Sequence, residues 1–207
     1  MSEIIADKVI SRIYGHGRGW VFVLSDFSDI ANPSTIKNIL ARFTKRGLIR
    51  RLMRGVYDYP SISKLLNELS PPDPDKIAQA IARSHGWTIW PDGNTALNLL
   101  GLSTQVPSTW EYLSDGPYRS YKWLGNTMRF KHRTNKETTV LSSKSALIVQ
   151  ALKALGEKNV DDKVIITISN HLNEKERKKI LKEAMYVTDW VYEIIKKACR
   201  LENYNNE

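Results

Sequence analysis

Apolar and polar positions in the first sixty residues follow two different periods. Apolar residues recur at helical spacing over residues 3–14, and again after Asn32-Pro33, where a preferred N-cap residue precedes a proline suited to the first helical position. Residues 20–23 form a short aromatic and β-branched run, and residues 25–30 predict a short capped helix. Residues 48–60 contain two β-type runs around a basic turn, which predicts a hairpin. Helix, strand, short helix, helix and hairpin in this order predict a winged helix-turn-helix.

A second domain is predicted after a polar joint at residues 70–74, where three prolines suit a stiff linker or a helix start. We therefore expect domains at residues 1–70 and 71–207. The run from Val164 to Ile168 is ambiguous between strand and helix, and its spacing favours a helix. Helices are also expected over residues 74–84, 94–100, 143–155, about 173–185 and about 188–202.

Short β-type runs in the second domain predict a small antiparallel sheet. They lie at residues 88–90, 110–113, 121–124, 128–131 and 138–141. Asp115-Gly116 and Gly125-Asn126 between them are hairpin signals. The chain is therefore predicted to be α+β, with an N-terminal winged helix-turn-helix followed by a mixed helical domain that contains a small antiparallel sheet.

The charge of the chain narrows the class of partner. The formal net charge is +9 over 207 residues, which favours polyanions, with nucleic acid first and an anionic membrane surface second. Between Asn32 and Arg54 there are seven basic residues and no acidic one, although the apolar positions needed for a core remain. A DNA-reading helix needs this division between a packed face and a face of hydrogen-bond donors. The alternative is a solvated basic face on a structural domain.

The residues predicted to contact DNA occupy the helix after Asn32 and the hairpin that follows it. The first exposed turn of such a helix usually enters the major groove, and arginines on the hairpin suit phosphate or minor-groove contacts. The predicted DNA-binding set is Ser34, Thr35, Lys37, Asn38, Arg42, Lys45, Arg46, Arg50, Arg51 and Arg54.

A second basic patch lies between residues 117 and 136, again without an acidic residue. Its basic members are Arg119, Lys122, Arg129, Lys131, Arg133 and Lys136, and Tyr118, Tyr121, Trp123 and Phe130 are interleaved with them. Basic residues among aromatics can bind nucleic acid by charge and stacking. The same alternation in a β-meander buries the aromatic side chains and leaves the basic ones in water, and we favour this second interpretation. A functional patch would extend the DNA footprint or meet an acidic partner.

The segment from Pro33 to Tyr57 resembles the N-terminal winged helix of AbiEi-type antitoxins, the antitoxin halves of abortive-infection (type IV) toxin–antitoxin systems. The resemblance is carried by Pro33-Ser34-Thr35-Ile36, by the run from Leu40 to Met53 and above all by Arg54-Gly55-Val56-Tyr57. The whole chain is also similar to a group of uncharacterised bacterial proteins with this module, including Trp90-Pro91-Asp92-Gly93-Asn94.

The resemblance implies two activities. Antitoxins of this type bind repeats in their own promoter through the winged helix and repress the operon, and their C-terminal domain opposes a toxin that resembles nucleotidyltransferases. Operator DNA and a cognate toxin are then the expected partners. A homodimer is expected as well, because two molecules on repeated half-sites supply affinity that one small domain lacks. By position, the resemblance implies that Lys37, Asn38, Arg42, Arg50, Arg51 and Arg54 face the DNA.

Little in the sequence indicates catalysis, a metal or a cofactor. The four histidines are scattered without ligand spacing, and residues 15–19 lack the Gly-Lys-Ser/Thr of a phosphate loop. Asp161-Asp162-Lys163 is the nearest approach to a nuclease motif, but a helix start explains it better, and Asp92 is interpreted as a helix cap. The lone Cys199 excludes an internal disulfide and suits a small apolar role. We expect no enzyme activity, no metal and no cofactor.

The expected location is the cytoplasm, without a membrane partner, because we find no signal peptide and no apolar run long enough to cross a bilayer. The leading hypothesis is a DNA-binding transcriptional regulator of the antitoxin type that represses its own operon and antagonises a toxin. One alternative is a scaffold that docks an acidic protein through the winged helix. A less favoured alternative is a DNA-processing enzyme that uses Asp161 or Asp162.

Overall fold

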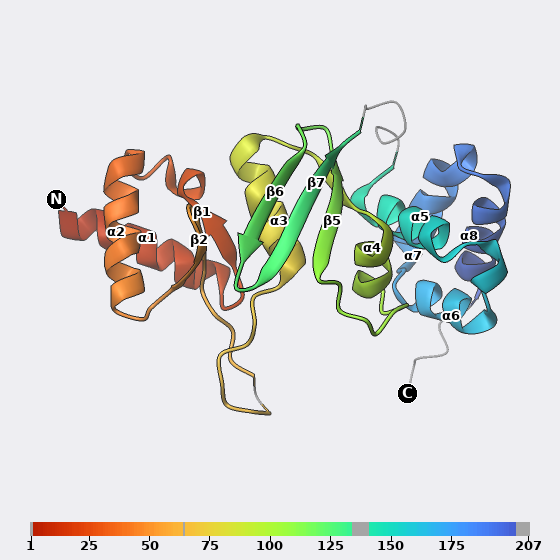
Figure 1. The fold of residues 1–207 in the computed structure, drawn as a ribbon, viewed down its shortest axis with the longest axis horizontal. Coiled ribbons are helices and arrows are strands. Elements are labelled where there is room, and N and C mark those ends of the chain that lie inside the picture. The colour runs from red at the N-terminus through yellow and green to blue at the C-terminus, as the bar shows by residue number, and fades with distance from the viewer. Residues whose placement is uncertain (1, 64, 134–140, 202–207) are drawn as a thin grey trace. The chain divides into compact units, whose positions relative to one another are not determined.

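The computed structural model describes residues 2–63, 65–133 and 141–201. Its helices and small sheets form an α+β fold, shown along the chain in Figure 1. The chain divides into two compact units, one of Met1–Trp87 with Lys122–Gly125 and one of Thr88–Tyr121 with Asn126–Glu207. Among the described residues, no helix has both the length and the apolar character needed to cross a membrane.

The first unit combines helices with a three-stranded sheet. Its helices are α1 (Ser2–His16), the 3-10 helix η1 (Leu24–Phe27), α2 (Pro33–Lys45) and α3 (Pro74–His85), and its strands are β1 (Val21–Val23), β2 (Arg50–Met53) and β3 (Val56–Asp58). β3 is the central strand and runs antiparallel to both neighbours. The helices and strands predicted for residues 3–60 therefore form in the predicted order.

One apolar core holds α1, η1 and α2 against this sheet. It contains Val9 and Ile13 from α1, Phe27 from η1, Ile36, Ile39, Leu40 and Phe43 from α2, and Phe22 and Tyr57 from the strands. Each of these side chains is 5% exposed or less, and full burial of a large apolar side chain stabilises a fold by roughly 1.5–3 kcal/mol. Because four residues of α2 lie in this core, the core also sets which side of α2 faces water.

The first unit includes α3, whereas the sequence predicts a boundary at residue 70. α3 packs against β1 and β3, and every residue of these two strands is buried. Lys76 donates to the carbonyl of Gly19 at 3.2 Å, and Arg83 forms an ion pair with Asp26 at 3.2 Å. These contacts attach α3 to the first unit although it follows the proline-rich joint.

The proline-rich joint ends in a helix start, one of the two structures that its three prolines suit. The side chain of Asp73 accepts a hydrogen bond from the backbone N–H of Asp75 at 2.9 Å. Pro74 follows as the first residue of α3, a position where its missing N–H has no helical partner to lose.

Residues 88–201 combine a four-stranded sheet with helices. The strands are β4 (Ile89–Pro91), β5 (Thr109–Ser114), β6 (Arg119–Trp123) and β7 (Asn126–His132), and the helices are α4 (Gly93–Leu99), α5 (Ser143–Leu155), η3 (Glu157–Asn159), α6 (Asp162–Asn170), α7 (Glu174–Glu183), η4 (Ala184–Tyr186) and α8 (Asp189–Arg200). The ambiguous run at residues 164–168 is helical, as predicted, and lies in α6. The β-type run expected at residues 138–141 lies, apart from Leu141, outside the described residues, as does Lys136 of the second patch.

The sheet is mixed rather than antiparallel, which corrects the prediction. Its order is β4-β5-β7-β6, and β5 pairs in parallel with β7 from Thr109 opposite Thr127 to Ser114 opposite His132. Residues 115–118 connect β5 to β6, which lies two positions away in the sheet. Strands lie about 4.8 Å apart, so this connection spans roughly 10 Å and leaves room for β7. Asp115-Gly116 is therefore not a hairpin turn between neighbouring strands.

A second apolar core joins α4 to the helices α5–α8. At its edge lies Arg177, which is only 5% exposed. Its guanidinium donates to the carbonyls of Ser169, Ala198 and Leu201 at 3.0, 2.9 and 2.8 Å. Carbonyls in the last turn of a helix have no partner inside the helix. This one side chain therefore supplies hydrogen bonds to carbonyls at the C-terminal ends of both α6 and α8.

Candidate nucleic-acid interface

The helix α2 begins at a side-chain cap that organises its first turn. The carboxamide oxygen of Asn32 accepts hydrogen bonds from the backbone N–H of Thr35 at 2.9 Å and from the hydroxyl of Ser34 at 2.8 Å. Pro33 occupies the first helical position. The hydroxyl proton of Ser34 is thus used within the protein, while its oxygen remains able to accept. Thr35 is half-buried.

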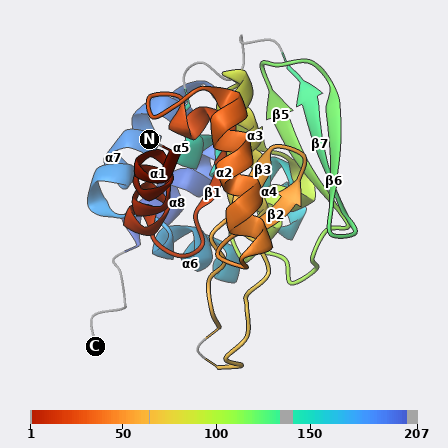
Figure 2. The same ribbon diagram turned by 90° about the vertical axis from the view of Figure 1, so that its left-hand side faces the viewer.

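The two faces of α2 differ in chemistry because its apolar residues recur with the helical period of 3.6 residues. The buried face consists of Ile36, Ile39, Leu40 and Phe43. The exposed face consists of Ser34, Lys37, Asn38, Ala41, Arg42 and Lys45. Figure 2 looks onto the side of the first unit where α2 lies. The helix contains no acidic residue, so its exposed face carries only neutral and positive groups.

In its first three turns, the exposed face of α2 presents a ridge of small side chains between two cations. At about 100° per residue, Ser34, Asn38 and Ala41 lie near the centre line of this face, and Lys45 continues this line in the last turn. Lys37 and Arg42 lie on its opposite flanks. Ala41 is exposed and adds nothing beyond its Cβ, and sequence reasoning did not select it. A groove-shaped partner could therefore approach the helix backbone closely while the two cations reach to either side.

The hairpin of β2 and β3 carries two exposed arginines and one that is paired. Arg51 and Arg54 are exposed. Arg50, by contrast, donates from Nε and Nη2 to the two carboxylate oxygens of Asp58 at 3.0 and 2.6 Å, and to the carbonyl of Ser70 at 3.1 Å. The side chain of Asp58 is only 2% exposed. The charge of Arg50, which the sequence predicts to face DNA, is therefore offset inside the protein.

Six exposed cations remain on α2, at its C-terminal end and on the hairpin. They are Lys37, Arg42, Lys45, Arg46, Arg51 and Arg54. Within the described part of the chain, none of them forms an ion pair. Lys45 and Arg46 lie at the negative end of the helix dipole, which stabilises positive charge there.

The acids nearest to this stretch in the sequence are held by other cations. Arg12 donates to both carboxylate oxygens of Asp29 at 2.6 Å. These hydrogen bonds lower the pKa of Asp29 to about 2, against the opposing effect of burial. Asp58, on the other side of the stretch, pairs with Arg50. The six cations thus keep their full charge toward solvent.

The second basic patch is partly neutralised by carboxylates. The Nζ atom of Lys131 lies 2.9 Å from Oε2 of Glu111 and 3.2 Å from Oδ2 of Asp92. The hydrogen bond to Glu111 above all raises the pKa of Lys131, helped by Asp92 and opposed by burial. Arg129 lies 3.8 Å from the other oxygen of Glu111. Two of the five cations of this patch that the structure describes therefore belong to local ion pairs.

The aromatic residues of the second patch lie mostly inside the protein. Trp123 and Phe130 are buried and Tyr121 is half-buried, whereas Tyr118 is 74% exposed. The remaining cations, Arg119, Lys122 and Arg133, are exposed. This distribution agrees with the interpretation that the alternating pattern serves packing.

The acidic residues considered for catalysis have separate roles. Asp161 caps α6 by accepting from the backbone N–H of Val164 at 2.9 Å. Asp92 occupies the N-cap position of α4 but makes no side-chain capping bond, and it pairs with Lys131 instead. In the ranges 2–63, 65–133 and 141–201, no group of three or more histidine, cysteine or acidic side chains is placed to hold a metal ion.

Comparison with known protein families matches residues 8–180 to a family of unknown function, DUF6088. The match covers most of the chain and residues from both units, so the protein belongs to this family. No curated protein matches the chain.

Proposed function

We propose that the first unit is a winged helix that binds double-stranded DNA, with α2 as the recognition helix and the β2–β3 turn as the wing. The observation that carries this proposal is the set of six exposed cations without an ion-pair partner among the described residues. A carboxylate within the set would repel phosphate. The flanking acids, Asp29 and Asp58, are instead paired with Arg12 and Arg50.

In this proposal the exposed face of α2 enters the major groove. Asn38 lies near the centre line of the face, where a carboxamide can form the two hydrogen bonds that distinguish adenine. Ala41 suits contact with a thymine methyl group. Lys37 and Arg42 on the flanks reach phosphates on the two sides of the groove, which sets the position of the helix without reading sequence. Arg51 and Arg54 add contacts from the wing.

The biological role proposed for this binding is repression of the protein's own operon, as the resemblance of residues 33–57 to AbiEi-type antitoxins implies. The second unit would then bind a nucleotidyltransferase-like toxin or a second copy of the chain. Two copies on repeated half-sites would raise the effective concentration of each unit at its site and so increase the affinity. This role would place the protein in the cytoplasm, without catalytic activity or a cofactor of its own.

The proposal is tested by titrating a labelled duplex from upstream of the gene with the full chain at several salt concentrations. Each phosphate contact releases counterions, so six contacts predict an affinity loss of about a thousandfold between about 50 and about 200 mM salt. Fluorescence anisotropy measures this loss directly. A binding constant that does not change with salt, or no binding to any duplex, would overturn the proposal.

A further inference from the structure

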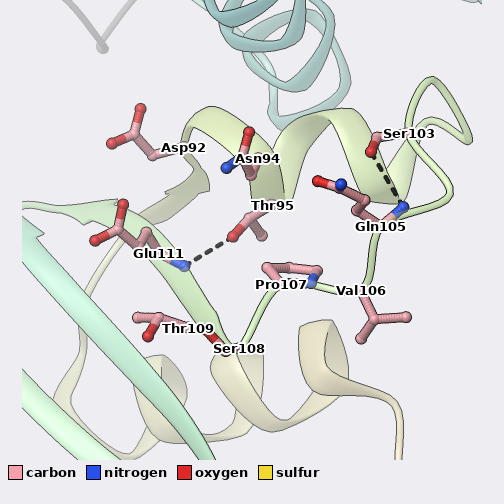
Figure 3. Close-up of a pocket in the computed structure, with 10 residues that line it drawn as sticks. All are labelled: Asp92, Asn94, Thr95, Ser103, Gln105, Val106, Pro107, Ser108, Thr109 and Glu111. Atoms are coloured by element: carbon pink, nitrogen blue, oxygen red, sulfur yellow. Dashed lines mark hydrogen bonds between the residues drawn. The ribbon is translucent and has the colours of Figure 1, made fainter.

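A polar cleft lies in the second unit, between α4, the start of β5 and the loop that joins them. Its volume is about 550 Å³, within the size range of small-molecule sites. Figure 3 shows the side chains that line it. Asp92, Asn94 and Glu111 stand at one end, and the side chain of Gln105 points from the loop toward Asn94 and Thr95. The lining belongs to residues that the DNA-binding proposal leaves without a role.

Hydrogen bonds fix the walls of the cleft. The carboxamide of Asn98 donates to the carbonyl of Gln105 at 3.0 Å, and the backbone N–H of Gln105 donates to the hydroxyl of Ser103 at 3.2 Å. On the opposite wall, the backbone N–H of Glu111 donates to the hydroxyl of the buried Thr95 at 2.7 Å. A site whose walls are already ordered spends less conformational entropy on binding.

Several polar groups face this cleft without using their hydrogen-bonding capacity. Among the described residues, the side chains of Asn94, Gln105, Ser108 and Thr109 have no hydrogen-bond partner within the protein. Two carboxamides and two hydroxyls can each donate and accept. Their convergence on one concavity favours a ligand that carries several hydroxyl groups.

The charges at the cleft offer no excess positive charge to an anionic ligand. Asp92 and Glu111 contribute two carboxylates, Lys131 lies between them at 3.2 and 2.9 Å, and Arg129 lies 3.8 Å from the other oxygen of Glu111. The two carboxylates and two cations balance, so no net charge attracts phosphate or carboxylate groups. The oxygen of Asp92 that Lys131 does not contact can accept hydrogen bonds from hydroxyl groups. Among the residues that the structure describes, none with an aromatic ring lines the cleft, so this lining offers no stacking surface for a nucleobase.

We infer that this cleft is a binding site for a neutral, polyhydroxylated small molecule of the sugar class. The carboxamides of Asn94 and Gln105 contact it, and the oxygen of Asp92 that Lys131 does not contact accepts from its hydroxyls. This inference is independent of DNA binding, because it concerns only residues of the second unit.

The test is a titration of the isotopically labelled full chain, followed by the NMR shifts of its backbone amides. The probes are D-ribose, D-glucose and D-galactose, with D-ribose 5-phosphate and spermidine as an anion and a cation. The inference predicts saturable shifts of residues 92–111 with at least one neutral sugar. It also predicts that ribose 5-phosphate binds no more tightly than ribose. No saturable shift with any neutral sugar, or preferential binding of spermidine, would overturn it.

Variants distinguish specific binding from contact with an open surface. Replacing both Asn94→Ala and Gln105→Ala should weaken sugar binding by about tenfold or more, since two hydrogen bonds are lost. The matched control is Asn170→Ala, at the exposed end of α6, which should bind as the parent does. Glu111→Gln should let ribose 5-phosphate bind more tightly than ribose, because Lys131 and Arg129 then face only the carboxylate of Asp92. Equal binding by the parent and the double variant would overturn the inference.

Discussion

Arg50 and Asp58 lie directly opposite each other across the β2–β3 hairpin and form a bidentate ion pair. The pair joins an arginine that is 25% exposed to an aspartate that is 2% exposed. Arg50 is therefore not available to a partner of the basic stretch, because its charge compensates the desolvation of the buried Asp58 carboxylate. The arginines beside it in sequence, Arg51 and Arg54, have no such role.

This pairing predicts that neighbouring arginines differ in their effect on stability. Arg50→Ala leaves the buried carboxylate of Asp58 without its partner and should lower the free energy of unfolding by about 3 kcal/mol. Arg51→Ala, at an exposed position, should change it by less than about 0.5 kcal/mol. Urea denaturation measures both. Equal effects from the two variants would mean that the ion pair contributes nothing particular to the fold.

Arg51 and Arg54 should instead contribute to DNA binding, and by a similar amount for every DNA sequence. Replacing both with alanine should weaken binding to every duplex and reduce the salt slope by about two, since two phosphate contacts are lost. Asn38→Ala should mainly reduce the preference for the operator over a scrambled duplex, by about 1–3 kcal/mol. Anisotropy titrations on both duplexes separate the two effects. Variants that bind as the parent does would show that this surface is not the interface.

The exposed Ala41 allows a second test of the same surface. Ala41→Glu places a negative charge and a longer side chain at the centre of the exposed face of α2. Like-charge contacts across an interface cost several kcal/mol, so DNA affinity should fall by more than about tenfold. Ala154→Glu, at an exposed position of α5, is the matched control and should leave affinity unchanged. If both variants lose affinity equally, the loss reflects net charge and not this face.

The capping box of α7 predicts a pH-dependent contribution to stability. The backbone N–H of Asn173 donates to Glu176 at 2.9 Å, and this bond, followed by Lys144, lowers the pKa of Glu176 against the effect of burial. A carboxyl group whose pKa is lowered in the folded state stabilises the protein at pH values above the ordinary glutamate pKa. This stabilisation is lost as the pH falls through the pKa of the folded state. Glu176→Gln should therefore cost about 0.3–1 kcal/mol at neutral pH and progressively less in acid.

Urea denaturation at neutral pH and at several acidic values checks this expectation. Glu174→Gln, an exposed acid in the same first turn, is the control for the helix dipole alone. The assignment of this stabilisation to the Glu176 carboxylate would be contradicted if the free energies of unfolding of Glu176→Gln and the parent differed by the same amount at every pH.

The thiol of Cys199 is expected to react slowly in the folded protein. Burial raises its pKa, although the positive charge of Arg177 opposes this shift, and the thiol also lies 3.8 Å from the carbonyl of Arg177. A smaller thiolate fraction and restricted access both slow attack on a disulfide reagent. Labelling with a chromogenic disulfide should be at least about tenfold slower in the native state than in urea at the same pH. Equal rates would show that the thiol is accessible.

Local signals in the sequence were sufficient for most of the elements. Asn32-Pro33 marks the start of α2 and Asp161 marks the start of α6, in each case because a side chain caps the first turn. The helical period separates buried from exposed positions of α2 without knowledge of the partner. These caps and this periodicity depend on residues within one or two turns of each other, so they can be predicted from the sequence alone.

Long-range pairing was beyond the reach of such signals. Asp115-Gly116 has the composition of a hairpin turn, yet β7 lies between the two strands that it connects. Asp92 occupies a cap position, yet its carboxylate pairs with Lys131, 39 residues away. The sequence does not indicate the cleft for the same reason, because Asn94, Gln105 and Glu111 meet only when α4 packs against β5.

The sequence by itself determined the order of elements in the first unit and the cation-rich, acid-free character of α2, since both follow from local periodicity and composition. Only the tertiary structure decided which cations remain available. Arg50 and Lys131 carry the same charge in the sequence as Arg51 and Arg133, but folding brings buried or half-buried carboxylates against the first two. Whether a charge faces solvent depends on partners that folding alone brings within hydrogen-bond distance.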